Sequence, residues 1–276
     1  MGPVAAATAI ATVRAAIDAG ISLLDTAQAY RTSEATLGQA LKDGYRQRCF
    51  LATKVSGDYS PTGIQQAMDN SLKALGVDEV DLYQIHSWNP QYPVADSIAA
   101  MLKLQEAGKT RYIGVSNYDA AQMAQALETG FFHSNQPRYN MFDRDIETAD
   151  LPFCREQGIG VLAHSPLAKG LLTNTYRPGH VFPTADERSD FPRFQGALFD
   201  RYIAVAGQLA AIAADKGLSL VQMAIAWILR REEVSCVLVG AKNQAQLQEH
   251  LGAADVSWSA GELATIDAML RAAPAG

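Results

Sequence analysis

The stretch Gly20–Tyr30, "GISLLDTAQAY", contains a transition from helix to strand. The rest of the chain shows the same alternation of helical and strand patterns. Before this stretch, residues 9–19 carry apolar side chains on one helical face, and Gly20 is a typical signal for the end of a helix. The apolar run after Gly20 predicts a buried strand that ends in the carboxylate of Asp25, and Tyr30 lies on the loop beyond. A solvated turn requires neither group, so the end of this strand is a candidate site of chemistry.

The alternation of helix and strand continues along the chain. Strands are predicted at 21–26, 49–55, 80–87, 112–117, 131–140, 160–167 and 235–241. Helices are predicted at 9–19, 34–41, 63–75, 95–106, 120–127, 146–156 and 204–230, and helical patterns also close the chain. Because the strands are continuously apolar, both faces of the sheet are expected to be covered by helices. The pattern predicts one α/β domain over residues 1–276 with the fold of a (β/α)8 TIM barrel.

The predicted strands number seven, whereas a TIM barrel has eight. The first predicted element is a helix, so the strand expected before residue 9 has no residues to form it. We therefore expect a barrel whose first strand has been lost from the sequence as given, one that is open at that position, or one whose free strand edge is covered by a partner.

Composition narrows the classes of function. The chain has 276 residues, 48% of them hydrophobic and 19% charged, and a formal net charge of -6 with scattered Lys and Arg residues. These values favour a soluble globular protein and give no basic surface for nucleic acid or an anionic membrane. We expect no apolar run long enough to span a bilayer. Cys49, Cys154 and Cys236 are far apart and do not suggest a disulfide framework, so a cytoplasmic location is expected.

Three successive strands end in polar side chains that fall on the inward-facing positions of a barrel. These are Asp25, Lys54 and His86, with Tyr30 on the loop after the first strand. A phenol has a pKa near 10, so it acts as a proton donor or acceptor near neutrality only when its anion is stabilised. Lys54 could supply the positive charge and Asp25 could hold the ammonium in place, while His86 could orient or polarise a substrate carbonyl. Each residue alone would more simply be structural, but the four together suggest one pocket.

Six motifs resemble those of the aldo-keto reductase family in order and spacing. They are "DTAQAY" (25–30), "FLATKV" (50–55), "LYQIHSWNP" (82–90), "GVSN" (114–117), "SPLAKGLL" (165–172) and "VLVGAKNQAQLQEHLGAA" (237–254). The resemblance covers nearly the whole chain. It implies an NADPH-dependent reductase of small aldehydes or ketones on a (β/α)8 barrel, with Tyr30, Asp25, Lys54 and His86 as the catalytic residues and Tyr30 as the proton donor.

The same resemblance implies the cofactor-binding residues. Ser116, Asn117 and Gln136 correspond to residues that hold the nicotinamide carboxamide, His164 to one that stacks on the ring, Ser165, Leu167 and Gly170 to the segment over the pyrophosphate, and Gly240, Lys242, Gln246 and Glu249 to the adenosine site. Lys242 also lies between a predicted strand and a helix, where an ammonium and free backbone N–H groups can bind a phosphate. This placement favours NADPH over NADH.

The sequence departs from the family pattern at several positions. His164 replaces a common aromatic residue, Arg31 replaces the glycine after the catalytic tyrosine, and His250 replaces an asparagine near the adenine. The family's first barrel strand and the hairpin before it are also absent. Residues 173–200 form a long segment rich in Pro and aromatic residues, which predicts a packed lid over the cofactor. Trp88 is a candidate wall of the substrate pocket or an ordinary loop anchor.

Other functions have weaker support. "GIGVLA" at 158–163 matches G-x-G-x-x-A but precedes a strand, so it does not fit a Rossmann fingerprint. The five histidines have no metal-binding spacing, and we expect no metal. Two alternatives stay open. Lys54 could form a Schiff base in a lyase or aldolase, and the chain could be a catalytically silent NADPH-binding or subunit protein. The natural carbonyl substrate and the oligomeric state are not predicted.

Overall fold

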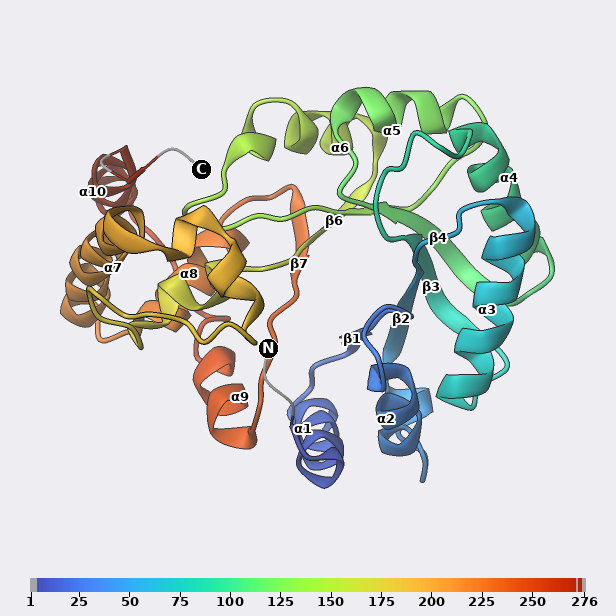
Figure 1. Ribbon diagram of the computed structural model, residues 1–276, viewed down its shortest axis with the longest axis horizontal. Coiled ribbons are helices and arrows are strands. Elements are labelled where there is room, and N and C mark those ends of the chain that lie inside the picture. The colour runs from blue at the N-terminus through green and yellow to red at the C-terminus, as the bar shows by residue number, and fades with distance from the viewer. Residues whose placement is uncertain (1–3, 272, 275–276) are drawn as a thin grey trace.

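The computed structural model describes residues 4–271 and 273–274, which form a curled parallel sheet inside a layer of helices (Figure 1). The seven strands are hydrogen-bonded in sequence order, from β1 to β7. They are β1 (Leu23–Asp25), β2 (Phe50–Val55), β3 (Val80–Ile85), β4 (Thr110–Ser116), β5 (Ser134–Gln136), β6 (Gly160–Ala163) and β7 (Val234–Val237). This is the expected (β/α)8 barrel with one strand missing.

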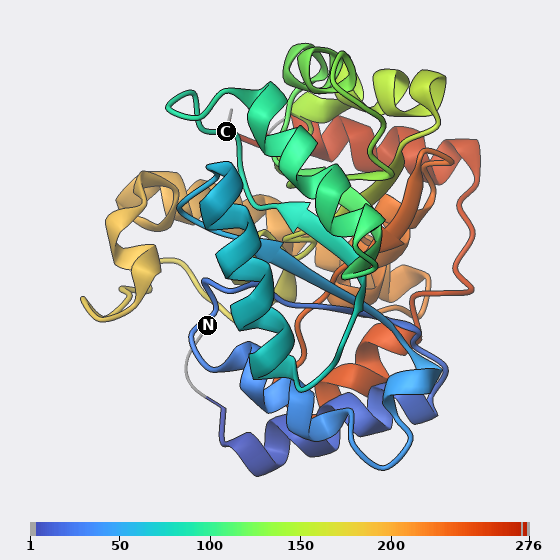
Figure 2. The same cartoon turned by 90° about the vertical axis from the view of Figure 1, so that its right-hand side faces the viewer.

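In the described part of the chain, ten α-helices form the outer layer. They are α1 (Ala6–Asp18), α2 (Ser33–Ala40), α3 (Pro61–Leu75), α4 (Val94–Glu106), α5 (Ala120–Leu127), α6 (Asp150–Gln157), α7 (Gly196–Asp215), α8 (Leu220–Leu229), α9 (Gln244–Leu251) and α10 (Ala260–Arg271). Figure 2 shows α2, α3 and α4 side by side outside β2 to β4. Local signals set the ends of these helices: Ser60 caps α3 and Gly76 ends it at φ 68°, a conformation that suits glycine.

The barrel is open between β1 and β7, each of which has a single strand neighbour among the described residues. Outside this gap α1 and α9 contact each other, so the layer of helices continues where the layer of strands is interrupted. The strand at the open edge is also less buried than a central strand. Every residue of β3 is buried, whereas all three residues of β1 are partly exposed.

Side chains alternate between the barrel interior and the surrounding helices. In β2, Phe50 and Ala52 belong to an apolar cluster inside the barrel, while Leu51 and Val55 pack in the main core between strands and helices. Lys54 continues the inward series at the carboxyl end of the strand. The alternation predicted from sequence therefore places the charged end of β2 at the mouth of the barrel.

Three elements differ from the sequence prediction. The helix predicted at 204–230 is two helices, α7 and α8, because Gly217 takes a φ of 74° and Ser219 starts a new helix with a capping box to Gln222. The helix predicted at 146–156 begins at Asp150, after a short 3-10 turn. The strand predicted at 131–140 is limited to the three residues of β5.

Residues 173–200 contain two complete 3-10 turns, Glu187–Asp190 and Pro192–Phe194, and end in the first turn of α7. Their aromatic side chains pack together, with the ring of Phe182 5.1 Å from Tyr176, 5.5 Å from Phe194 and 5.7 Å from Phe199. The guanidinium of Arg188 lies 4.3 Å above the ring of Phe182. This segment is therefore ordered by its own aromatic cluster.

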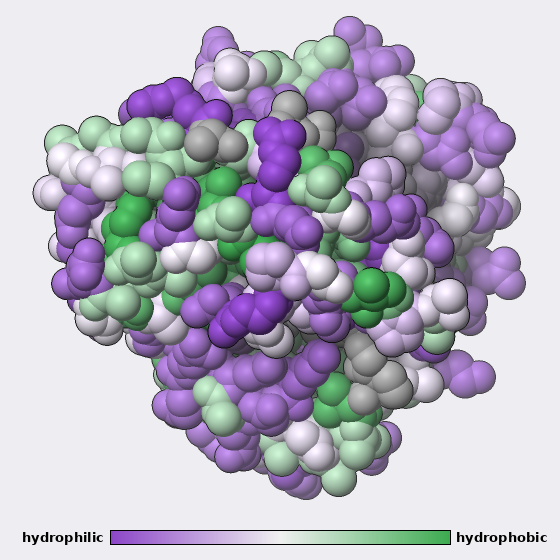
Figure 3. Space-filling model, turned by 60° about the vertical axis from the view of Figure 1, so that its left-hand side comes forward, coloured by the Kyte–Doolittle hydropathy of each residue, from purple (hydrophilic) through white to green (hydrophobic). Residues whose placement is uncertain are grey.

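Helix α7 is 20 residues long and, by length and composition alone, apolar enough to cross a membrane, which the sequence analysis did not anticipate. In the barrel it packs against α8 and α10. Phe199, Tyr202 and Leu209 are buried along this contact. The surface on this side of the molecule mixes hydrophilic and hydrophobic residues (Figure 3). Packing in the core thus accounts for the apolar side chains of α7.

Candidate active site

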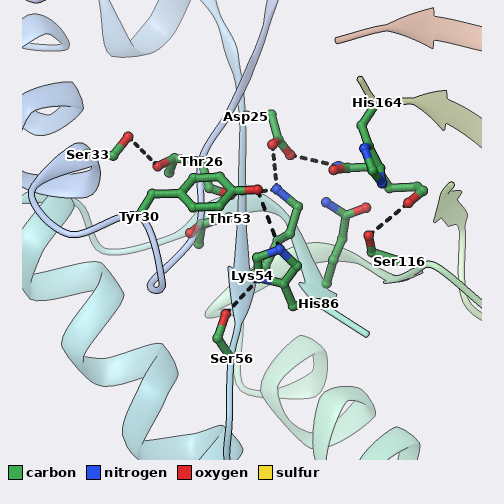
Figure 4. Close-up of polar contacts among 12 residues, drawn as sticks. Asp25, Thr26, Tyr30, Ser33, Thr53, Lys54, Ser56, His86, Ser116 and His164 are labelled. Carbon is green, nitrogen blue, oxygen red and sulfur yellow. Dashed lines mark hydrogen bonds and ion pairs between the residues drawn. The ribbon is translucent and has the colours of Figure 1, made fainter. Parts of the chain in front are cut away.

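The side chains of Asp25, Lys54, Tyr30 and His86 meet at the carboxyl ends of β1, β2 and β3 (Figure 4). The Lys54 ammonium is fully buried and lies 2.5 Å from Asp25 Oδ2. It also donates to the carbonyl oxygen of Thr26 at 2.9 Å. Parallel pairing of Asp25 with Ala52 in the register of β1 and β2 brings the carboxylate beside the next inward residue of β2. The expected ion pair is therefore present.

Tyr30 reaches this pair from the loop after β1. Its hydroxyl lies 3.4 Å from His86 Nε2, and the Lys54 ammonium lies 5.3 Å from the centre of its ring. The Tyr30 carbonyl accepts from Ser33 N–H at 2.9 Å across a turn that contains Arg31 at a φ of 52°. A hydrogen bond of 2.8 Å between Thr26 and Ser33 ties this turn to the strand end. The loop is thus held so that the phenol points into the site.

Burial and charge set the protonation states of these groups. Burial and the charge of Asp25 raise the pKa of Tyr30 to about 12, so the phenol keeps its proton at neutral pH. Although 47% of the surface of Tyr30 is exposed, its hydroxyl end faces the other site residues. Burial lowers the pKa of Lys54, and the attraction of Asp25 offsets only part of that effect. Burial and the charge of Lys54 lower the pKa of His86, which favours its neutral form.

Lys54 is predicted to stabilise the anion that Tyr30 forms when it gives up its proton, and this role stays a prediction. In the structure the phenol is held in its protonated form. The phenolate is disfavoured because burial removes it from water and because the negative charge of Asp25, which is paired with Lys54, repels it. The protonated phenol of Tyr30, next to the neutral imidazole of His86, is therefore available as a proton donor.

A second group of predicted residues adjoins the first. His164 Nε2 lies 2.8 Å from Asn117 Oδ1, and Asn117 Nδ2 donates to the His86 carbonyl at 3.2 Å. Ser116 Oγ donates to the Gln136 carbonyl at 2.8 Å, and Gln136 Nε2 donates to Asp25 Oδ1 at 2.8 Å. Four predicted cofactor residues, Ser116, Asn117, Gln136 and His164, are therefore linked by hydrogen bonds to the catalytic candidates.

His164 is held as a neutral ring. Burial and the nearby charges of Lys54 and Arg138 lower its pKa to about 4. Its Nδ1 lies 2.9 Å from Ser165 Oγ, so both ring nitrogens have a polar partner. The imidazole therefore keeps a fixed orientation at the end of β6.

The loop after β6 has a tightly folded backbone. Ser165, Ala168 and Lys169 have φ values of 57°, 47° and 53°, and Gly170 has a φ of 105°. Non-glycine residues rarely occupy this region, and clusters of them occur at ligand sites. The φ of Gly170 favours glycine, and a Cβ atom there would also lie 3.1 Å from the Tyr176 ring and 3.3 Å from the Arg188 guanidinium, both tight contacts. Leu167 is half-buried within the same loop.

The predicted adenosine residues form a separate group beyond β7. Gln246 and Glu249 lie on α9, whose first turn is capped by Asn243, and Gly240 and Lys242 precede it. The backbone N–H of Lys242 donates to Gln246 Oε1 at 2.8 Å. Lys242 is exposed, and within the described part of the chain its ammonium forms no ion pair. Among the described residues, the hydrogen bonds of this group are local and do not reach the candidate catalytic residues.

Ser56 also adjoins the site, although it is not among the residues predicted from the sequence; its Oγ lies 2.7 Å from His86 Nδ1. The sequence contains the signal for this position, because Ser56 follows Lys54 by two residues and continues the inward series of β2.

Within residues 4–271 and 273–274, no group of three His, Cys, Asp or Glu side chains is arranged to hold a metal ion. The ring of Trp88 packs edge-on against Tyr118 at 5.1 Å, which fits a loop anchor.

Comparisons with known proteins agree with this geometry. The family model described as "Aldo/keto reductase family" matches residues 1–271. The curated protein "Aldo-keto reductase YhdN" of Bacillus subtilis (strain 168) is 37% identical over 254 residues, which are 87% of this chain and 77% of that protein.

Two solved structures are similar over most of their length. The glycerol dehydrogenase AKR11B4 from Gluconobacter oxydans has a TM-score of 0.89 and 31% identity, over 97% of this chain and 86% of its own. The thermostable aldo-keto reductase Tm1743 has a TM-score of 0.79 and 28% identity, over 96% and 88% respectively. The chain therefore belongs to the aldo/keto reductase family and is an NAD(P)H-dependent oxidoreductase.

Proposed function

We propose that this protein uses NADPH to reduce the carbonyl group of small aldehydes or ketones to an alcohol, with Tyr30 as the proton donor. The observation that supports this most directly is the convergence of four side chains from three strand ends. Lys54 and Asp25 form a buried ion pair, and the protonated Tyr30 hydroxyl lies 3.4 Å from His86 Nε2.

The residues at the barrel mouth fit a nicotinamide dinucleotide. Asn117 and Gln136 offer amide groups, the neutral imidazole of His164 offers a flat ring, and Gly170 keeps the loop beside it free of a side chain. In this proposal Ser116, Asn117, Gln136 and His164 hold the nicotinamide end. Ser165, Leu167 and Gly170 lie along the pyrophosphate, while Gly240, Lys242, Gln246 and Glu249 hold the adenosine end.

In this proposal the side chains of the protein supply the proton for the carbonyl oxygen. When bound, the cofactor supplies the hydride that the reduction needs. His86 Nε2 and Tyr30 Oη together orient the carbonyl oxygen, and Tyr30 gives its proton to that oxygen as negative charge develops there. Lys54 stabilises the phenolate that remains, and Asp25 keeps the ammonium charged and in place.

The preference for NADPH rests on Lys242. Its exposed ammonium, which forms no ion pair with the described residues, precedes the first turn of α9, where free backbone N–H groups would also favour a bound anion. A charge-assisted contact with a phosphate would favour NADPH over NADH.

The proposal includes a lid formed by residues 173–200. Arg188 Nη1 donates to the Lys169 carbonyl at 3.1 Å, and the Lys169 ammonium lies 2.9 Å from Glu187 Oε1. These contacts join the segment to the loop that carries Gly170, so movement of one would move the other. We place the lid and barrel in one domain, residues 1–276, and the protein in the cytoplasm.

The direct test is NADPH-dependent carbonyl reduction by the purified chain and by Tyr30→Phe. We expect the variant to bind NADPH like the wild type, as judged by fluorescence titration, and to lose at least about 100-fold in kcat. Unchanged turnover by Tyr30→Phe would refute the mechanism. Tight cofactor binding without turnover of any carbonyl compound by the wild type would instead support the silent-binding alternative.

One observation favours the lysine alternative, because the lowered pKa of Lys54 is what an amine nucleophile needs. However, its ammonium already donates to Asp25 and to the Thr26 carbonyl. Borohydride trapping of a carbonyl compound on Lys54 would support a Schiff-base activity, and we expect no trapping.

A further inference from the structure

The imidazole of His86 has a partner on each of its nitrogen atoms. Ser56 Oγ, just past the end of β2, lies 2.7 Å from Nδ1, and Tyr30 Oη lies 3.4 Å from Nε2 (Figure 4). Ser56 is half-buried, and its backbone N–H faces Gln28 Oε1 at 3.4 Å. The shorter of the two imidazole contacts is therefore on the side away from the reacting groups.

The backbone of His86 is also fixed. Its N–H donates to the Val55 carbonyl at 3.2 Å, and its carbonyl accepts from Asn117 Nδ2 at 3.2 Å. With the backbone held on both sides, the ring keeps two freedoms that matter for chemistry. It can rotate about its bond to Cβ, and it can carry its proton on either nitrogen.

The number of donors and the lengths of the two contacts together indicate the direction of the Ser56 contact. A neutral imidazole has one N–H donor and one acceptor nitrogen. Across the described residues, Ser56 Oγ has His86 Nδ1 as its only side-chain or backbone partner. If Nδ1 carried the proton, the Ser56 hydroxyl hydrogen would have no acceptor among the described residues, and if Nε2 carried it, the same would hold for the Tyr30 hydroxyl hydrogen. The contact of Ser56 Oγ with Nδ1 is 2.7 Å and that of Tyr30 Oη with Nε2 is 3.4 Å, so donation by Ser56 to Nδ1 is the stronger hydrogen bond and leaves the proton of His86 on Nε2.

We propose that Ser56 is a positioning residue that holds His86 in the orientation and tautomer with its proton on Nε2, facing Tyr30 and the substrate carbonyl. This inference rests on the proposed reductase function. In that reaction the Nε2–H group donates to the carbonyl oxygen, so an imidazole turned over or protonated on Nδ1 would present the wrong nitrogen. Ser56 itself touches no reacting atom and acts through His86.

The first test observes the tautomer directly. Long-range proton–nitrogen correlation spectra of protein labelled with nitrogen-15 histidine distinguish the two neutral forms, and the chain has five histidines to resolve. The signals of His86 are assigned by their loss in His86→Gln. We expect the Nε2–H form in the wild type and in Ser56→Thr, which keeps the hydroxyl, and a mixture of forms in Ser56→Ala. A wild-type signal for Nδ1–H would overturn the proposal without any variant being made.

The second test is kinetic. Ser56→Ala is expected to lower kcat/KM for carbonyl reduction roughly tenfold, the effect of losing one well-placed hydrogen bond, with NADPH affinity unchanged and activity largely restored in Ser56→Thr. Ser87→Ala is the matched control, because that exposed serine follows His86 but its hydroxyl lies 3.1 Å from Tyr59 Oη instead. If Tyr30→Phe abolishes turnover while Ser56→Ala matches the wild type, only the role of Ser56 is wrong. If Tyr30→Phe stays active, the proposed function itself fails.

Discussion

The Lys54 ammonium and the Asp25 carboxylate lie 2.5 Å apart, with the lysine side chain fully buried and that of the aspartate 12% exposed. The second carboxylate oxygen accepts from Gln136 Nε2 at 2.8 Å. Asp25 therefore holds two donors from two other strands, β2 and β5, at one point of the barrel mouth. The Asp25 carboxylate therefore neutralises a buried cation and also connects β1 to β2 and β5.

Asp25→Asn should destabilise the fold as well as the reaction. An amide keeps one acceptor oxygen for two donors, and it leaves the buried charge of Lys54 without compensation. We expect a loss of about 3–5 kcal/mol in the free energy of unfolding, measured by urea denaturation. Lys54→Met should cost less, because the remaining carboxylate has partial access to water and keeps Gln136.

The double variant Asp25→Asn/Lys54→Met separates this explanation from simple damage to packing. It buries no unpaired charge, so it should recover part of the stability lost by Asp25→Asn. Strictly additive losses in the two single variants and the double variant would show that the charge pair is not the cause.

His164 should make the fold sensitive to mild acid. Its pKa is lowered to about 4 from an ordinary value of 6.5, so the unfolded chain binds a proton that the folded site resists. This contribution to stability is fully present above pH 6.5 and is lost as the pH falls toward 4. Its full size is at most about 3 kcal/mol.

The measurement is the free energy of unfolding from pH 7.5 to 4 for the wild type and His164→Phe. The variant should have a shallower loss between pH 6.5 and 4, while His180→Gln, at an exposed histidine in the aromatic cluster, should follow the wild type. Parallel curves for His164→Phe and the wild type would contradict the assignment.

The sequence predicts where the candidate catalytic side chains meet because their positions follow from a local rule. Inward positions alternate along each strand, so Asp25, Lys54 and His86 fall at the same edge of a parallel barrel once the strands are located. The motifs then supply the order of the strands. The one residue of this series that was missed, Ser56, obeys the same alternation but follows the end of the apolar run.

Local sequence patterns do not predict contacts between side chains that are far apart along the chain. The hydrogen bond from His164 to Asn117 joins β6 to the end of β4, and the sequence presents these residues only as separate motifs. The break between α7 and α8 was missed because apolar periodicity runs through both helices. Gly217 and the capping box at Ser219 were the local signals, and they outweighed the periodicity.

Lys242→Ala should weaken the binding of NADPH more than the binding of NADH. Loss of a charge-assisted contact to a phosphate should raise the Kd for NADPH about 10- to 100-fold and leave the Kd for NADH nearly unchanged. Fluorescence titrations at low salt measure both constants. Lys103→Ala, on α4 away from the barrel mouth, is the control. Equal weakening of both cofactors would mean that Lys242 acts on the loop rather than on the phosphate.

Two glycines inside helices should respond oppositely to alanine. Gly38 lies in α2 against the end of α3, where a Cβ atom would come 2.4 Å from the Leu75 carbonyl oxygen and 3.0 Å from that of Ala74. Both are backbone atoms, so α2 and α3 would have to separate. We expect Gly38→Ala to lower the free energy of unfolding by about 1–3 kcal/mol, the usual cost of overpacking. At Gly207 in α7 a Cβ atom would meet nothing within 4 Å, and Gly207→Ala should stabilise the protein by about 0.5–1 kcal/mol through helix propensity. Urea denaturation of the two variants tests whether close contact between the backbones of α2 and α3 sets the packing of the barrel there, since a neutral or stabilising Gly38→Ala would show that this contact can relax.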